Sequence, residues 1–219
     1  MEPFKVPAPF RELTNPYASA AELLDAARRG GEEARIGLAR LWLSEGIPFA
    51  FREHPALYEA VRTWLSIQLD VHAKEISLTG SARLGSSLAP RQVGKPFGES
   101  SDLDLFIVSD RLFDRVKGDF IRWSIDFERG AVKPRNTREE GFWTSNYSRG
   151  HKLIERGFLD SKMIPNLSSY PTTKKVSQLM WLLVEKLKVT VGAPRPSQAS
   201  VRCYASWSSY IRQICISLR

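Results

Sequence analysis

Two acidic residues in an apolar segment are the strongest chemical feature of this sequence. Asp102 and Asp104 flank Leu103 and lead into the apolar run from Leu105 to Val108. If this segment is a strand, period-two alternation places both carboxylates on one face. Two carboxylates so close together repel each other unless a cation compensates them. Oxygen-only ligands suit Mg²⁺, which is held by one or two carboxylates together with substrate phosphates. The pair therefore predicts a site for Mg²⁺ or Mn²⁺.

A glycine-serine turn precedes the acidic pair in the chain. The alternating segment Ile76–Leu78 predicts a short strand that ends at Gly80 and Ser81, and residues 82–84 can begin a helix behind the turn. Backbone N–H groups at a helix start, together with the Ser81 hydroxyl, form a site for phosphate oxygens. A phosphate-binding turn followed by a metal-binding acid pair predicts a nucleoside triphosphate site.

These residues also match the motifs of a known family. Residues 80–85 fit the pattern Gly-Ser-x-x-x-Gly, and Asp102-Leu103-Asp104 fits Asp-x-Asp on the following strand. Over about residues 74–110 the chain resembles the polymerase-β-like nucleotidyltransferase superfamily. The resemblance implies an α+β fold whose mixed β-sheet is flanked by helices. It also implies that Gly80, Ser81, Arg83 and Gly85 bind the nucleotide and that Asp102 and Asp104 hold the catalytic metals.

The resemblance extends to a third carboxylate and departs from the family in one loop. Residues 157–165 resemble the strand that carries the third metal ligand, a role we assign to Asp160; the alternative is an aspartate at the start of a strand that caps a turn. Glu155 is a nearby rival, whereas Asp126 falls within a helical pattern and is expected on a helix surface. The insert at residues 87–100 is longer than the family pattern, and we interpret it as a loop over the triphosphate. Its Lys95 could neutralise phosphate charge or only aid solubility.

Hydrophobic spacing and turn residues predict the elements around this site. Residues 1–16, with four prolines, are expected to form an extended arm. Helices are expected at 18–30, 32–43, 55–69 and 111–129, after Pro171 and after Ser206, with a short strand at 201–205. The first three helices are predicted to brace the back of the sheet, and residues 132–149 to form a loop over a base. We expect an N-terminal arm with bracing helices at 1–73, the nucleotidyltransferase core at 74–170, and C-terminal helices at 171–219 that complete the same domain.

Composition indicates the class of protein and its partners. The chain has 219 residues, a net charge of +8 and two cysteines without a Cys-x-x-Cys motif. The positive charge suits polyphosphate or nucleic acid, although it equally serves solubility. The cysteine pattern favours neither a zinc site nor a disulfide framework. The chain begins without an apolar leader and has no 18-residue apolar run, so we expect a cytoplasmic protein with no membrane partner.

Two functions from different classes fit these residues. The first is a metal-dependent nucleotidyltransferase that moves a nucleoside monophosphate from a nucleoside triphosphate to an acceptor hydroxyl and releases pyrophosphate. The acceptor could be RNA, a nucleotide, a protein or a small molecule, and the oligomeric state is open. The second is a non-catalytic nucleotide- or RNA-binding module on the same fold. The intact acidic pair favours the enzyme, because a binder without metal would gain by losing one of the two charges.

Overall fold

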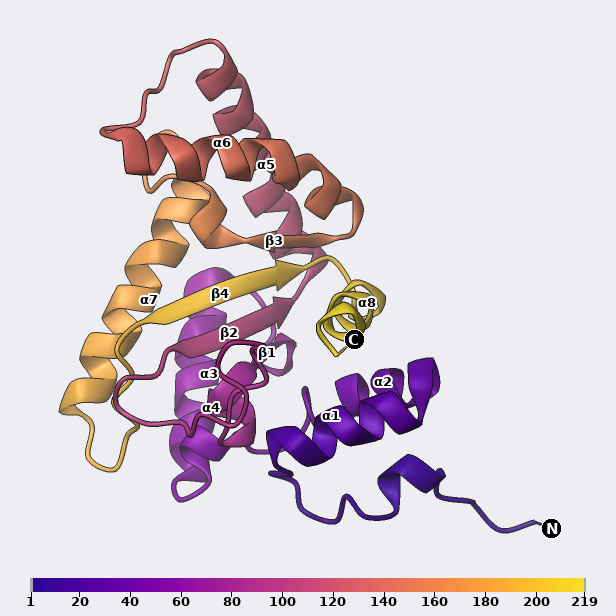
Figure 1. The fold of residues 1–219 in the computed structure, drawn as a ribbon. Coiled ribbons are helices and arrows are strands. Elements are labelled where there is room, and N and C mark those ends of the chain that lie inside the picture. The colour runs from indigo at the N-terminus through magenta and orange to yellow at the C-terminus, as the bar shows by residue number, and fades with distance from the viewer. Residues whose placement is uncertain (1, 219) are drawn as a thin grey trace.

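A four-stranded mixed sheet forms the centre of the protein (Figure 1). The computed structural model describes residues 2–218. The strands are β1 (Ile76–Leu78), β2 (Leu103–Val108), β3 (Phe158–Asp160) and β4 (Ala199–Tyr204), in the spatial order β1-β2-β4-β3. β4 runs parallel to β2, whereas β1 and β3 run antiparallel to their neighbours. Residues after 171 therefore supply an interior strand of the sheet as well as helices.

Helices flank the sheet and make the protein an α+β fold, as predicted. Within residues 2–218 the α-helices are α1 (Ala20–Arg29), α2 (Gly31–Arg40), α3 (Pro55–Leu69), α4 (Gly80–Leu84), α5 (Asp110–Glu128), α6 (Thr137–Glu155), α7 (Pro171–Val189) and α8 (Trp207–Ser217). Local signals set several of their starts. Ser19 and Glu22 form a capping box at α1, proline begins α3 and α7, and Ser206 caps α8. None of these helices is both long and apolar enough to span a membrane.

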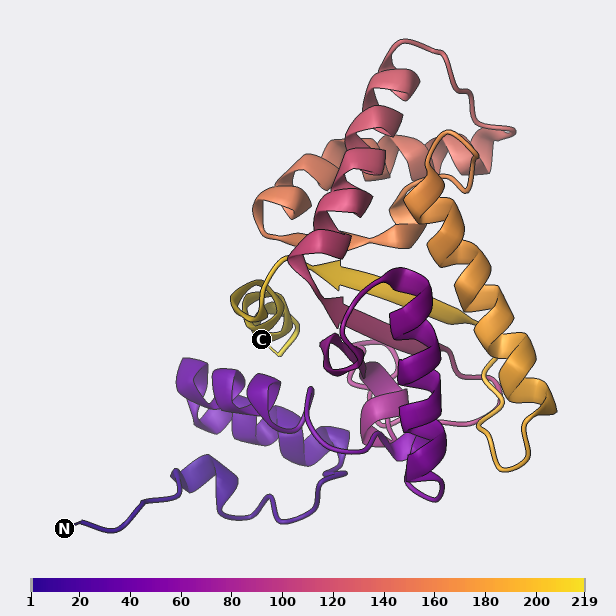
Figure 2. The same ribbon diagram turned by 180° about the vertical axis from the view of Figure 1, so that it is seen from behind.

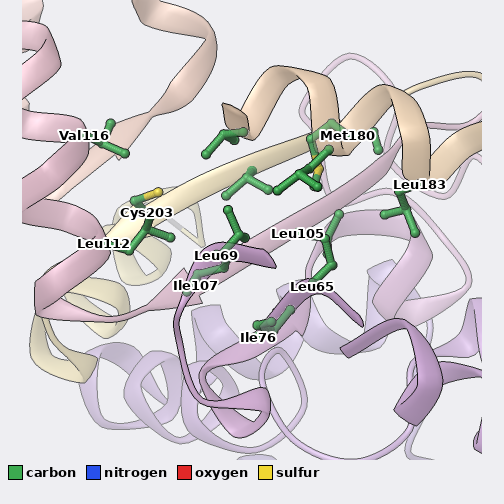
Figure 3. Packing of buried hydrophobic residues seen from close by; sticks show 14 of the residues in the cluster. Leu65, Leu69, Ile76, Leu105, Ile107, Leu112, Val116, Met180, Leu183 and Cys203 are labelled. Atoms are coloured by element: carbon green, nitrogen blue, oxygen red, sulfur yellow. The ribbon is translucent and has the colours of Figure 1, made fainter. Parts of the chain in front are cut away.

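The two faces of the sheet pack against different helices. Leu103, Leu105 and Ile107 of β2 lie in a core with α3, α5 and α7. Figure 3 shows part of this core, and Figure 2 shows α3 and α7 lying over this side of the sheet. The alternate residues Phe106 and Val108 lie in a second core with α1, α2 and α8. The prediction that the first three helices brace the back of the sheet thus holds for α3, whereas α1 and α2 pack on the side that carries Asp104.

The segment predicted to be a loop over a base is helix α6 instead. Asn136 caps this helix by accepting a hydrogen bond from the Glu139 N–H. Trp143 is buried near the Trp123 and Phe127 rings of α5. A Cβ atom at Gly150 would overlap the Phe120 ring, so glycine permits close approach of α6 to α5. The sequence did not predict this helix, because α6 buries only a narrow stripe of residues and the rest of the segment is polar and interrupted by glycine.

The predicted strand at residues 157–165 is also shorter than expected. β3 ends at Asp160, and Ser161–Met163 form a 3₁₀ turn. The Asp160 carboxylate accepts a hydrogen bond from the Lys162 N–H at 2.9 Å, which caps this turn. Asp160 therefore caps a turn, as the alternative expected, but it does so from the end of a strand and not from the start of one.

Candidate functional site

The glycine-serine turn follows β1, and the acidic pair lies at the start of the adjacent strand β2: Asp104 is within β2, whereas Asp102, expected in the same strand, immediately precedes it. Leu78 of β1 pairs with Leu105 of β2, and the next N–H along the chain, that of Thr79, donates to the Asp104 carbonyl at 2.9 Å. Gly80 then turns the chain with φ of +65°, a conformation that favours glycine. A Cβ atom built on Gly80 would lie 3.7 Å from Asp104 Oδ2. The turn therefore passes directly beside the Asp104 carboxylate.

This turn opens into a cavity of about 690 Å³ that also contains the acidic pair. Its polar and charged lining includes Ser81, Lys95, Asp102, Asp104 and Arg202. The insert at residues 87–100 contributes several lining residues and is folded back on itself, because the Ser87 N–H donates to the Lys95 carbonyl at 2.9 Å. The insert therefore forms one wall of the cavity. A cavity of this size is in the range that binds a small ligand.

Helix α8 covers one part of this face of the sheet and lines the cavity beside it. Asp104 and Phe106 project from the same face of β2, because they are two residues apart. The Phe106 ring stacks on Tyr210 of α8 with ring centroids 4.3 Å apart, so this part of the face is closed. Ile214 and Ile216, further along α8, line the cavity beside Asp104. The sheet thus presents its acidic end to the cavity and its aromatic end to the core.

Neutral donors from β4 and from the two residues before it form hydrogen bonds with the two carboxylates. Asp102 accepts hydrogen bonds from Ser197 Oγ and Gln198 Nε2, both at 2.8 Å. Asp104 Oδ1 accepts a short hydrogen bond of 2.5 Å from Ser200 Oγ. A hydroxyl or amide donor stabilises a carboxylate less than a cation does. The pair therefore retains the negative charge that a divalent cation would neutralise.

Two residues of the glycine-serine motif support the fold and do not reach the cavity. Arg83 is buried, and its Nε donates to the Trp42 carbonyl at 3.0 Å. Desolvation lowers the pKa of this guanidinium. Gly85 closes α4 with φ of +89°, and a Cβ atom there would lie 2.7 Å from the Phe49 ring. The prediction that Arg83 and Gly85 bind the nucleotide is therefore corrected: both residues hold α4 against the N-terminal region.

Asp160 lies on the same sheet face as Asp104 but in a different cavity. Asp160 pairs in register with Arg202 of β4, and Arg202 pairs with Phe106 of β2, so β4 separates the two acids. Asp160 lines a second cavity of about 860 Å³ between α6, β3 and α8. Burial raises the pKa of its carboxyl, and the charges of Arg202 and Lys162 oppose that rise. Within residues 2–218, no three His, Cys, Asp or Glu side chains are close enough together to hold a metal ion.

The rival acids lie away from both aspartates of the pair. Asp126 accepts a hydrogen bond from the Tyr170 hydroxyl at 2.9 Å, which ties α5 to the start of α7. Glu155 is the exposed last residue of α6. Neither lines the cavity of Asp102 and Asp104.

Strand β4 contributes to the site in a way that the sequence did not predict. Ser200 and Arg202 alternate with Ala199, Val201 and Cys203, so the pattern of a strand with one polar face was present in the sequence. That pattern does not indicate which strand β4 pairs with. Only the observed pairing places Ser200 beside Asp104 and Arg202 between Asp104 and Asp160.

Comparison with known proteins identifies no relative of this chain. No protein-family model, curated protein or solved structure matches the chain. The superfamily resemblance is therefore carried by the motif residues alone.

Proposed function

We propose that this protein is a metal-dependent nucleotidyltransferase. It would transfer a nucleoside monophosphate from a nucleoside triphosphate to an acceptor hydroxyl and release pyrophosphate. The observation that carries the proposal is the position of the Gly80-Ser81 turn against Asp104, in a cavity that also contains Asp102. A phosphate-binding turn and a metal-binding acid pair must be adjacent for this chemistry, and in sequence they are separated by the whole insert.

The chain's own residues provide positioning and charge. Asp102 and Asp104 are oxygen donors lining one cavity, so they fit Mg²⁺ or Mn²⁺ and would hold the ion. A divalent ion bound there supplies Lewis-acid polarisation and neutralises phosphate charge. Ser81 and Lys95 line the same cavity, and their hydroxyl and ammonium groups would orient the phosphates. Asp160 is left out of this ligand set, because its carboxylate lines the other cavity.

One observation favours the alternative, a non-catalytic nucleotide-binding module. Ser197, Gln198 and Ser200 already donate hydrogen bonds to the acidic pair. A carboxylate pair with such partners is tolerated in a fold without any metal. Binding and turnover therefore have to be measured separately.

The test is incubation of the protein with each of the four labelled ribonucleoside triphosphates and Mg²⁺, with and without bulk RNA. We expect pyrophosphate release and a labelled product from at least one of them. Asp102→Ala and Asp104→Ala should abolish both signals and keep the fold. Asp114→Ala, which removes an exposed acid of α5, is the matched control and should keep full activity. Nucleotide binding without pyrophosphate release would contradict the enzyme and support the non-catalytic binding module. Wild-type turnover in Asp104→Ala would refute the assignment of the catalytic site.

A further inference from the structure

We propose that Arg202 is an anion-binding residue that holds the phosphates of an oligophosphate ligand where the two cavities meet. We also propose that Asp160 competes with this ligand for the Arg202 guanidinium. The inference rests on the proposed function, because it names the residue that would hold the leaving pyrophosphate. It adds a cation on the strand beside the acidic pair, which no motif in the sequence indicates.

The strand register places Arg202 between the two acids. Arg202 pairs with Phe106 on one side and with Asp160 on the other. Paired residues project from the same face of a sheet, and Asp104 and Phe106 share that face. Arg202 is therefore on the same face as Asp104, one strand over and two residues further along β4 than Ser200, the partner of Asp104.

The cavities meet at Arg202. Arg202, Ile214 and Ser217 line both the first cavity, of about 690 Å³, and the second, of about 860 Å³. Two of these shared residues belong to α8 and the third to β4, so both elements contribute to the boundary between the cavities. An anion bound to Arg202 is consequently in reach of groups from either cavity.

The present partner of Arg202 holds it loosely. Arg202 Nε lies 3.8 Å from Asp160 Oδ2, and the two side chains are 38% and 25% exposed. A tight guanidinium–carboxylate hydrogen bond is about 2.7–2.9 Å long, so this ion pair leaves most of the binding capacity of the guanidinium unused. The other oxygen of Asp160 is engaged with the Lys162 N–H. A stronger anion can therefore displace Asp160 from Arg202 without breaking the turn that Asp160 caps.

The chemistry of the first cavity favours an oligophosphate. The guanidinium fork matches two phosphate oxygens at once. Ser81 and Lys95 line the same cavity and supply a hydroxyl and an ammonium for further phosphates. The acidic pair in that cavity requires the phosphates to arrive with a divalent cation. These groups together fit a magnesium-bound chain of phosphates better than a single carboxylate or sulfate.

The test is calorimetric titration of the full chain with Mg²⁺-tripolyphosphate, which measures binding without any transfer reaction. Arg202→Gln should weaken binding roughly ten- to a hundredfold, the range expected for a lost hydrogen bond to a charged group. Arg202→Lys should restore part of the affinity, because it keeps the charge but not the fork. Arg212→Gln, which removes an exposed cation of α8 that lines neither cavity, should bind like the wild type.

Asp160→Asn provides an independent second test. Asparagine keeps the oxygen that caps the 3₁₀ turn and removes the charge that competes for Arg202, so we expect several-fold tighter binding. Weaker binding would show that Asp160 helps to hold the metal. It would overturn the proposal that Asp160 competes with the phosphates for Arg202. Wild-type affinity in Arg202→Gln, or no binding by the wild-type protein, would overturn the anion site. Arg202-dependent binding without nucleotidyl transfer would instead remove the proposed function and keep this inference.

Discussion

Gly80 and Gly85 belong to one motif, and alanine substitutions should separate their roles. At Gly85, alanine would have to adopt φ of +89°, which costs about 1–2 kcal/mol for a residue with a Cβ atom. Its Cβ would also lie 2.7 Å from the Phe49 ring, and relieving such overpacking costs about 1–3 kcal/mol. We therefore expect Gly85→Ala to lower the free energy of unfolding by about 2–5 kcal/mol, a large part of the roughly 5–15 kcal/mol of a typical domain.

Gly80→Ala should cost less stability and more function. Its φ of +65° carries the same backbone cost of about 1–2 kcal/mol. The nearest atom to the new Cβ is Asp104 Oδ2 at 3.7 Å, an ordinary contact, so no overpacking is added. The methyl group would, however, lie beside the carboxylate that we assign to the metal. We expect nucleotidyl transfer to fall far more in Gly80→Ala than in folded Gly85→Ala.

The assay is urea unfolding followed by tryptophan fluorescence, with transfer measured in parallel under conditions where each variant is folded. Gly118→Ala is the control, because Gly118 lies within α5 with no atom within 4 Å of its Cβ position. It should be stabilised by about 0.5–1 kcal/mol through helix propensity. If Gly80→Ala loses as much stability as Gly85→Ala, or keeps full transfer, the division of roles between the two glycines is refuted.

Two further predictions concern side chains of the cavities. Ser81→Ala should reduce the catalytic efficiency of transfer roughly ten- to a hundredfold, since a hydrogen bond to a charged phosphate is worth about 1.5–3 kcal/mol; an unchanged efficiency would show that the Ser81 hydroxyl does not contact the nucleotide. Burial raises the pKa of the Asp160 carboxyl above its ordinary value of 3.8, so the native state binds this proton more tightly than the unfolded state does. The protonated carboxyl therefore stabilises the fold at low pH, and this stabilisation is lost as the pH rises through the raised native-state pKa. The stability of Asp160→Asn relative to wild type should therefore increase between pH 3.5 and pH 7 in urea unfolding, and a constant difference would contradict the direction of the shift.

Local sequence signals predicted those parts of the fold that depend on neighbouring residues. The proline that begins α3 and the apolar spacing of α5 and α7 placed these helices within a few residues of their observed bounds. Period-two alternation likewise separated Asp104 from Leu103 and Leu105, which lie on opposite faces of β2. These predictions succeed because helix caps, hydrophobic periodicity and strand alternation are set within one or two turns of chain.

The tertiary structure decided which of the chemically capable residues meet. Pairing of β4 with β2 joins residues almost 100 positions apart, and it places Ser200 and Arg202 beside the acidic strand while moving Asp160 one strand further away. The inward direction of Arg83 depends on Trp42, and the close packing of α6 depends on Gly150 meeting Phe120. The sequence determined the acidic pair and the glycine-serine turn. It could not determine these partners, because strand order and side-chain direction follow from non-local packing of surfaces that no single segment contains.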